Sequence, residues 1–512
     1  MQALAAYAVS APGFLGVNTT DSPTDLEGGY ALSAINCVLD QYGRIGARKG
    51  WEPLHTVSAS LGTSPVESIG EYIDADGSAT IIVAGNNKLF KLSGSTLVEL
   101  TYGGGGVAPT ISGNRWSMCS IDGYFVMFQL GHDPLAYVPS VSTTQYRRLS
   151  EVAGYSGTVQ LADVAISAFG RCWNAVTTSN KVTIQFSDVK SPHKYSGGSS
   201  GTLDLTTVWP SGGDSIVALG AHNNRLFIFG KQHVLIYKDA STPATMSLED
   251  TLHGVGAVGK DSVCNTDTDI IFLSRAGVLS VMRTIQEKSA PIRDMSKNVR
   301  TDLLQAMSLE DVTKVVSTWN PKEGFVLFQF PVAQITYCFD TKQSLQNGAA
   351  RVTTWDSINP VSMYTKLDGT LLFGQAGYVG QYSGYLDNTA SYRMQYFSPY
   401  VDFGNPIAIS MLKRITAVVI GGFSQVVTTK WCYDYTGGYY SQTATIPSNK
   451  AGEYGISEYG VAEYSSGVVI NTMVSQASGS GKVAQIGIET NISGSALSLQ
   501  KLEVYAKNGR LA

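Results

Sequence analysis

The chain has 512 residues, only 15 % of which are charged, and its formal net charge is −4. This composition argues against a surface built to hold nucleic-acid phosphates tightly, because such binding depends on clustered Lys and Arg. The 54 glycines and 27 tyrosines favour many strands and tight turns over helices, and the length suits two or three domains. We therefore expect an all-β protein.

The N-terminal segment, residues 1–50, carries the first strand signals. Its beginning is apolar, but no Lys or Arg precedes Arg44, so we do not expect a secretory signal. Residues 33–51 alternate in polarity and turn at 41–43, which predicts a β-hairpin. A strand from this segment is expected to complete a sheet whose other strands come from much later in the chain.

Between residues 80 and 382 one pattern occurs seven times: an apolar run, a tight polar or Gly-containing turn, and a second apolar run. Successive copies lie roughly 42 to 54 residues apart, an interval typical of four-stranded propeller blades. The paired runs are 81–83 with 89–92, 124–128 with 135–138, 172–176 with 182–186, 226–229 with 234–237, 270–273 with 278–281, 325–328 with 335–339, and 371–373 with 378–382. They predict a β-propeller of six or seven blades over residues 51–384, which residues 1–50 close or decorate.

Residues 296–307 depart from the strand pattern. Val299, Leu303 and Met307 lie four residues apart and form one apolar stripe, with Ser296 as a possible N-cap. Residues 308–311 then offer a second capping box. We expect a short amphipathic helix that lies on the propeller between the fifth and sixth blades.

After Gly384 the spacing changes, which indicates a separate domain at 385–512. Residues 396–404, 413–422, 428–435, 468–474, 483–489 and 497–506 alternate like the strands of a β-sandwich. Residues 453–464 repeat a Glu-Tyr pair every five residues. Because five is neither the strand nor the helix period, we expect an irregular exposed loop, either a solvated connector or a contact surface for another chain.

Several motifs resemble functional sites without the context that such sites need. Residues 254–260 contain Gly-x-Gly-x-x-Gly followed by Lys260, but strand-like sequence follows where a dinucleotide site needs a helix, so we expect an inter-blade loop. Residues 74–77 resemble the start of a calcium loop but lack its closing Glu, which favours a β-turn. The six cysteines are scattered singly in apolar runs and are expected to be buried free thiols.

No residue pattern predicts catalysis. The six histidines do not fall at zinc-ligand spacing, and the four glycines at 103–106 lack the Lys-Ser or Lys-Thr of a phosphate-binding loop. A propeller glycosidase would need two facing carboxylates, and the sialidase box Ser-x-Asp-x-Gly-x-Thr-Trp is absent from the sequence. We therefore predict no enzyme activity, no catalytic or metal-ligating residue, no cofactor, and no membrane span.

The chain resembles the tail nozzle (hub) proteins of short-tailed bacteriophages, also called packaged-DNA stabilisation or tail tubular B proteins. The resemblance rests on Asn36, Gly43 and Arg48-Lys49-Gly50 near the N-terminus, on the propeller, and on the lone helix after residues 290–293. The most similar stretches are 215–220, 224–230, 234–237, 254–259, 262–263, 271–274 and 277–278, together with the phrase Gly-Lys-x-x-Gln-Ile-Gly-Ile at 481–488.

This resemblance implies a structural virion protein that assembles in the bacterial cytoplasm and remains in the virion tail. The family forms a homo-hexameric ring below the portal and adaptor rings, in contact with tail fibres or tailspikes. It makes the lower tail tube, which retains packaged DNA and lets it pass on ejection without sequence-specific binding. The alternative is a β-propeller binding module that recognises a glycan or a host receptor, and a hydrolase is a third, weaker reading.

Overall fold

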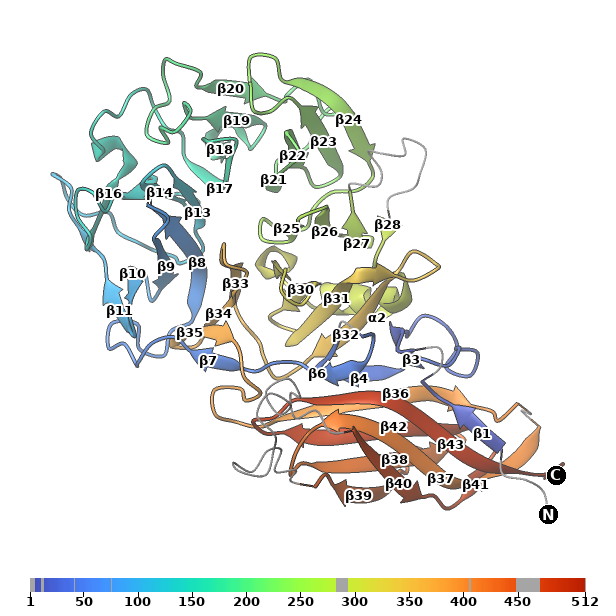
Figure 1. Cartoon of the computed structure of the whole chain (residues 1–512). Coiled ribbons are helices and arrows are strands. Elements are labelled where there is room, and N and C mark those ends of the chain that lie inside the picture. The colour runs from blue at the N-terminus through green and yellow to red at the C-terminus, as the bar shows by residue number, and fades with distance from the viewer. Residues whose placement is uncertain are drawn as a thin grey trace.

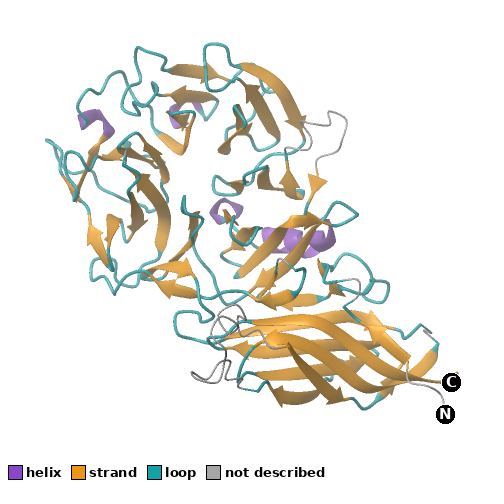
Figure 2. Cartoon of the chain, in the orientation of Figure 1, coloured by secondary structure: helices purple, strands orange, loops and turns teal. Residues whose placement is uncertain are grey.

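The computed structural model describes residues 5–10, 13–40, 42–74, 76–281, 293–404, 407–447 and 470–511. It shows a ring of small sheets beside an elongated β-sandwich, with both ends of the chain at the far end of the sandwich (Figure 1). Strands and loops account for nearly all of the fold, and helical turns are few (Figure 2). The predicted all-β architecture of a propeller and a sandwich is confirmed.

The ring contains seven blades, of which six are separate sheets and one is shared with the sandwich. The first blade consists of β8 (Val66–Ile73), β9 (Ala79–Gly85), β10 (Lys88–Ser93) and β11 (Thr96–Glu99). The second consists of β13 (Ser117–Ile121), β14 (Tyr124–Phe128), β15 (Leu135–Tyr137) and β16 (Gln145–Arg148), joined by β12 (Thr101–Tyr102). The third consists of β17 (Ala162–Ala168), β18 (Arg171–Val176), β19 (Thr183–Phe186) and β20 (Gly201–Asp204), and the fourth of β21 (Ala218–His222), β22 (Arg225–Phe229), β23 (His233–Lys238) and β24 (Ser247–His253).

The remaining blades complete the ring. The fifth blade consists of β25 (Val263–Asn265), β26 (Ile270–Ser274), β27 (Gly277–Ser280) and β28 (Arg293–Asp294). The sixth consists of β29 (Val316–Asn320), β30 (Phe325–Phe330), β31 (Ile335–Ser344) and β32 (Ala350–Trp355). The seventh consists of β33 (Ser362–Thr365), β34 (Leu371–Gln375), β35 (Tyr378–Tyr382) and β7 (Trp51–Pro53). Each of the seven predicted pairs of apolar runs is the central hairpin of one blade, so those predictions are confirmed.

The central hairpins are apolar on both faces because each blade is packed between two others. In β22, Leu226 and Ile228 share a core with Trp173 of the preceding blade. Phe227 and Phe229 face the following blade, where the Phe229 and Phe272 rings lie 5.0 Å apart. This two-sided burial explains why the hairpins appear in the sequence as unbroken apolar runs rather than as alternating ones.

The ring is closed by the N-terminal part of the chain. Strand β7 pairs antiparallel with β35, in the register Tyr382 opposite Trp51, and the inner strand β33 of this last blade lies against β8 of the first. The last blade thus combines three strands from near residue 370 with one from near residue 52. This is the long-range completion that the sequence predicted for a strand of the N-terminal segment.

The sandwich consists of two sheets with one core between them. The first sheet continues the sixth blade through β4 (Ser33–Ile35), β36 (Tyr392–Val401), β42 (Ala484–Ile492), β38 (Val426–Tyr433) and β39 (Tyr440–Thr445). The second contains β40 (Ile470–Gln476), β37 (Ala408–Gly421), β43 (Leu497–Leu511), β6 (Ile45–Ala47) and β5 (Cys37–Leu39), with β1 (Ala5–Ala8) on β43 and β41 (Ser480–Gly481) on β37. The six predicted sandwich strands are all present, with ends that differ by a few residues.

Residues 1–50 were expected to close or decorate the propeller, and most of their described strands pair with the sandwich instead. The predicted hairpin exists as β5 and β6, but β6 pairs with β43. Strand β4 lies between β32 of the propeller and β36 of the sandwich. A small parallel pair, β2 (Gly16–Val17) and β3 (Tyr30–Ala31), packs beside β32 and β36. The N-terminal segment therefore joins the two domains.

The predicted helix is present between the fifth and sixth blades, but its start differs. A 3₁₀ turn, η3 (Lys297–Val299), leads into α2 (Arg300–Ser308), which buries Leu303 and Met307 as the stripe predicted. Ser296 occupies the N-cap position of η3, but its side chain makes no capping hydrogen bond, because its hydroxyl accepts the backbone N–H of Val278 and donates to Asp294. The predicted capping box at 308–311 is also wrong.

Three short 3₁₀ turns complete the helical structure of the described residues. They are η1 (Leu149–Glu151), η2 (Thr177–Ser179) and η4 (Val312–Lys314). In η4 it is Asp311 that serves as the cap, by accepting the backbone N–H of Thr313. Two further predictions are confirmed: Asp74 and Gly77 lie in the turn between β8 and β9, and all six cysteines are buried free thiols. The five-residue repeat at 453–464 lies outside the described residues.

Candidate functional site

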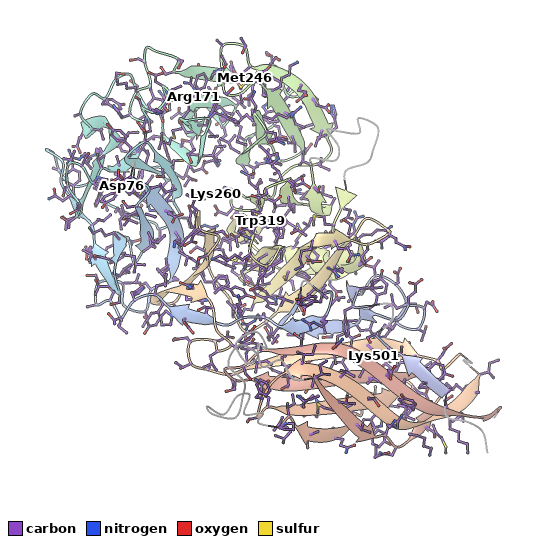
Figure 3. All side chains as sticks on the ribbon, viewed as in Figure 1. Asp76, Arg171, Met246, Lys260, Trp319 and Lys501 are labelled. Carbon is purple, nitrogen blue, oxygen red and sulfur yellow. The ribbon has the colours of Figure 1, made fainter. Side chains whose placement is uncertain are left out.

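The glycine-rich loop at 254–260 connects β24 to β25 and is the inter-blade loop that the sequence predicted. Its glycines serve close packing. A Cβ on Gly256 would lie 2.3 Å from the carbonyl oxygen of Gly230, in the central hairpin turn of the fourth blade. A Cβ on Gly259 would lie 2.9 Å from the carbonyl oxygen of Val312, in the loop before the sixth blade. The loop is thus held between the turn of the fourth blade and the loop before the sixth, and Lys260 follows directly at the inner side of the ring (Figure 3).

A cavity of about 970 Å³ opens at this mouth of the propeller channel. Its walls come from the loops before the inner strands and from the central hairpin turns of the second to sixth blades. Six cationic side chains contribute to the lining, together with one carboxylate, that of Asp163. The cations are Arg115, Lys181, Lys231, Lys260, Arg275 and Lys314. We call this set the basic mouth.

Half of the basic mouth is neutralised by neighbouring carboxylates. Lys181 contacts Asp163 at 2.6 Å, Lys314 contacts Asp311 at 3.6 Å, and Arg115 forms an ion pair with Asp261. Within the part of the chain that the structure describes, the side chains of the other three cations form no ion pair. The basic mouth therefore keeps an excess of positive charge in a protein whose net charge is negative.

Lys260 is the most enclosed of these three unpaired cations. Its ammonium group donates to two backbone carbonyl oxygens, of Arg115 at 3.1 Å and of Asp163 at 3.4 Å. Burial lowers the pKa of Lys260, because a charged group loses hydration inside the protein. The ammonium is thus held by neutral partners in a position where a bound anion would stabilise its charge.

The turn that carries Lys231 is fixed by a buried carboxylate. Asp214 accepts the backbone N–H groups of Lys231 and Gln232, each at 2.9 Å, and contacts Nδ1 of His233 at 3.0 Å. Burial opposes ionisation of Asp214, yet these hydrogen bonds, with one from the N–H of Ser215, outweigh it and keep the pKa of the carboxyl below its usual value. The position of Lys231 at the cavity is therefore set by the fold.

A second cavity, of about 750 Å³, lies among the fifth, sixth and seventh blades and has a different character. Trp319 and Tyr364 contribute aromatic surface, and Lys322, Lys366 and Asp368 contribute charges of both signs. Burial raises the pKa of Tyr364 to about 12. This second mouth is a mixed aromatic and polar surface, in contrast to the basic mouth.

The junction between propeller and sandwich contains a buried ion pair between the two linkers that cross it. Arg48, whose side chain is fully buried, donates to both carboxylate oxygens of Asp387, at 2.9 and 2.6 Å. It also donates to Asn36 at 3.1 Å and to Ser357 at 2.6 Å, while its guanidinium lies 4.0 Å from the centre of the Tyr392 ring. Every part of the guanidinium is thus engaged, as a buried charge requires.

The two linkers approach so closely that one position must be glycine. A Cβ on Gly50 would lie 1.8 Å from the carbonyl oxygen of Leu386. Asn36 adopts a left-handed backbone with φ of 55° and links the junction to Asp356 and to the carbonyl of Arg393. Asn36, Arg48 and Gly50 are residues on which the family resemblance rests, and the structure brings them together at this junction.

No site residue was predicted from the sequence, and the basic mouth was missed for an identifiable reason. Its six cations come from separate loops, one or two per blade, so they form no cluster and no period in the sequence. Their shared signal is position, because each precedes an inner strand or occupies or flanks the turn of a central hairpin. No group of three or more His, Cys, Asp or Glu able to hold a metal ion occurs among the described residues.

Comparisons with known proteins do not assign this chain to a family. No family model matches the chain, and no curated protein matches it. Among solved structures, the WD40 domain of Neurospora crassa Pan2 is 10 % identical, with 65 % of this chain and 96 % of that one covered and a TM-score of 0.40. The match to a protein from Lactobacillus plantarum covers 69 % of this chain and 92 % of that one, with 10 % identity and a TM-score of 0.36. The match to apo AztD from Citrobacter koseri covers 71 % of this chain and 83 % of that one, with 10 % identity and a TM-score of 0.32.

The fold and its surfaces define a class: a β-propeller joined to a β-sandwich through a shared sheet, with one basic and one aromatic channel mouth. None of the helices formed by the described residues has the length and apolar character needed to span a bilayer.

Proposed function

We propose that this chain is a structural subunit of the tail nozzle of a short-tailed bacteriophage. In this role identical subunits form a ring, a hexamer by family resemblance, at the lower end of the tail tube. The ring would contact portal or adaptor proteins above and tail fibres or tailspikes at its sides. It would retain packaged DNA and let it pass on ejection, and the chain would act in the virion without catalysis.

The observation that carries this proposal is the junction between the two domains. The residues that resemble the nozzle family, Asn36, Arg48 and Gly50, lie where the linkers cross between propeller and sandwich. In addition, β4 makes one continuous sheet out of the sixth blade and half of the sandwich. A subunit of a load-bearing tube needs such a fixed angle between its domains, whereas an enzyme or a sensor commonly places a hinge at a domain boundary.

The low overall charge also suits a tube through which DNA must slide. Each firm contact between a cation and a phosphate adds to the barrier against movement, and a net charge of −4 provides few of them. The basic mouth does not conflict with this role, because it is a cavity of small-molecule size within one chain.

The test is assembly. The purified full-length chain, alone and mixed with the adaptor ring of the same virus, is examined by light scattering and negative-stain microscopy. We expect rings whose subunit interfaces bury more than about 2,000 Å², as in obligate assemblies. Monomers under both conditions would contradict the proposal.

The second mouth favours the alternative, a binding module for a glycan or host receptor. Trp319 and Tyr364 offer aromatic surface beside charged and polar groups, a combination that suits sugar rings with their apolar faces and hydroxyl edges. A glycan array probed with the chain discriminates between the two functions. Binding by a monomer that never forms rings, lost on replacement of Trp319 by alanine, would favour the alternative over the nozzle.

A further inference from the structure

The basic mouth has the size and the charge of a ligand site. Its volume of about 970 Å³ is at the upper end of the range for small-molecule pockets, which is roughly 300–1,000 Å³. Of its six cations, Lys231, Lys260 and Arg275 form no ion pair among the described residues. Clefts lined by one sign of charge concentrate ligands of the opposite sign.

The three unpaired cations reach the cavity from three different loops. Lys231 comes from the central hairpin turn of the fourth blade, Arg275 from that of the fifth, and Lys260 from the loop between these blades. Lys231 and Arg275 are exposed, so their charges are available at the surface of the cavity. Lys260 lies deeper and is oriented by the carbonyl oxygens of Arg115 and Asp163. Together they form one continuous part of the cavity wall, made by two adjacent blades and the loop between them.

We propose that the basic mouth binds a small compound that carries several phosphate groups. Tetrahedral phosphates present oxygens in several directions and so can be met by donors from several loops, as the three cations are arranged here. A planar carboxylate is instead matched best by the fork of a single Arg. A ligand with more than one phosphate also carries enough charge to engage all three cations at once.

The backbone of the glycine-rich loop is not the phosphate-binding element in this site. Gly256 and Gly259 are occupied by close packing against the neighbouring blades, and the N–H of Gly259 donates to the hydroxyl of Ser262. Recognition therefore depends on side-chain cations, chiefly Lys260, whose ammonium forms hydrogen bonds with backbone carbonyl oxygens. An anion beside it would restore the charged form that burial disfavours.

Isothermal titration of the full-length chain with sodium tripolyphosphate at low salt tests this inference. We expect one molecule bound per chain. Lys260→Gln should weaken binding about tenfold or more, because it removes a charge-assisted hydrogen bond, and Lys231→Gln and Arg275→Gln should each weaken it about three- to tenfold. The matched control is Lys366→Gln in the second mouth, which should leave binding unchanged.

The exposed side chains of Lys231 and Arg275 make their variants safe for folding, so the test does not depend on Lys260 alone. Absence of tripolyphosphate binding, or binding that all three variants leave unchanged, overturns the inference. Citrate provides the carboxylate comparison: affinity equal to that of tripolyphosphate overturns the assignment to phosphate. The titration needs no ring assembly, so its failure and that of the proposed function are distinguishable.

Discussion

Replacing Asp387 by alanine would leave the guanidinium of Arg48 buried without its counter-ion. The Arg48 side chain is fully buried and the Asp387 side chain is 10 % exposed, so water cannot take over the lost contact. Breaking a buried ion pair by removing one partner costs about 3–5 kcal/mol. Both oxygens of Asp387 accept hydrogen bonds here, so we expect a loss in the free energy of unfolding within this range.

The assay is urea denaturation followed by tryptophan fluorescence, since the ring of Trp355 lies 5.7 Å from the Arg48 guanidinium. Arg48→Met and the double variant complete a thermodynamic cycle. Because the methionine removes the unpaired charge, the double variant should lose less than the sum of the single losses, with a coupling of about 2 kcal/mol or more. The control is Asp368→Ala, which removes an exposed carboxylate from its ion pair with Lys366, with an expected loss below about 1 kcal/mol.

A loss below about 1 kcal/mol for Asp387→Ala, or strictly additive effects in the cycle, would refute the view that this ion pair holds the domains together.

Three further outcomes follow from the fold. Gly256→Ala should destabilise the propeller by about 1–3 kcal/mol in the same assay, because its Cβ meets the backbone of the neighbouring blade, whereas Gly213→Ala, with open space around it, should change stability by less than about 0.5 kcal/mol. The pKa of Asp214 is lowered in the folded state, so its stabilising contribution is complete above its usual pKa of about 3.9 and is lost as pH falls through the lower folded value. The difference in the free energy of unfolding between wild type and Asp214→Asn should therefore narrow between about pH 5 and pH 2. A difference that stays constant over this range would contradict the argument. Burial raises the pKa of Cys264 to about 12 and encloses the other five thiols, so a thiol reagent should modify none in the native protein and all six after denaturation.

The central hairpins were predictable because their signal is local. Each consists of two apolar runs joined by a short turn, and burial between two blades makes those runs continuous. The inner and outer strands were not identified individually, because several have only two to five residues and one exposed face. Strand β39, with most of its side chains exposed, carries no apolar pattern at all and was missed.

The joining of the domains could not be derived from sequence patterns, because it depends on contacts between distant segments. Ile35 pairs with Thr354, and Arg48 with Asp387, across more than 300 residues. The predicted start of the helix was wrong for a related reason. Ser296 has the residue type of an N-cap, but its hydroxyl is used by Val278 in a neighbouring strand, a partner that local sequence cannot show.

The closure of the ring by β7 has a consequence for synthesis of the protein on the ribosome. Trp51 emerges early, but its partner Tyr382 is made about 330 residues later, which takes roughly 20–70 s at ordinary elongation rates. Strand β1 waits longer still, because β43 is the last strand to be translated. Throughout this interval the nascent chain exposes unpaired strand edges on its first and most recent blades. Co-translational folding can thus build separate blades, whereas the ring closes only once β35 has been made and the sandwich is completed only once β43 has been made.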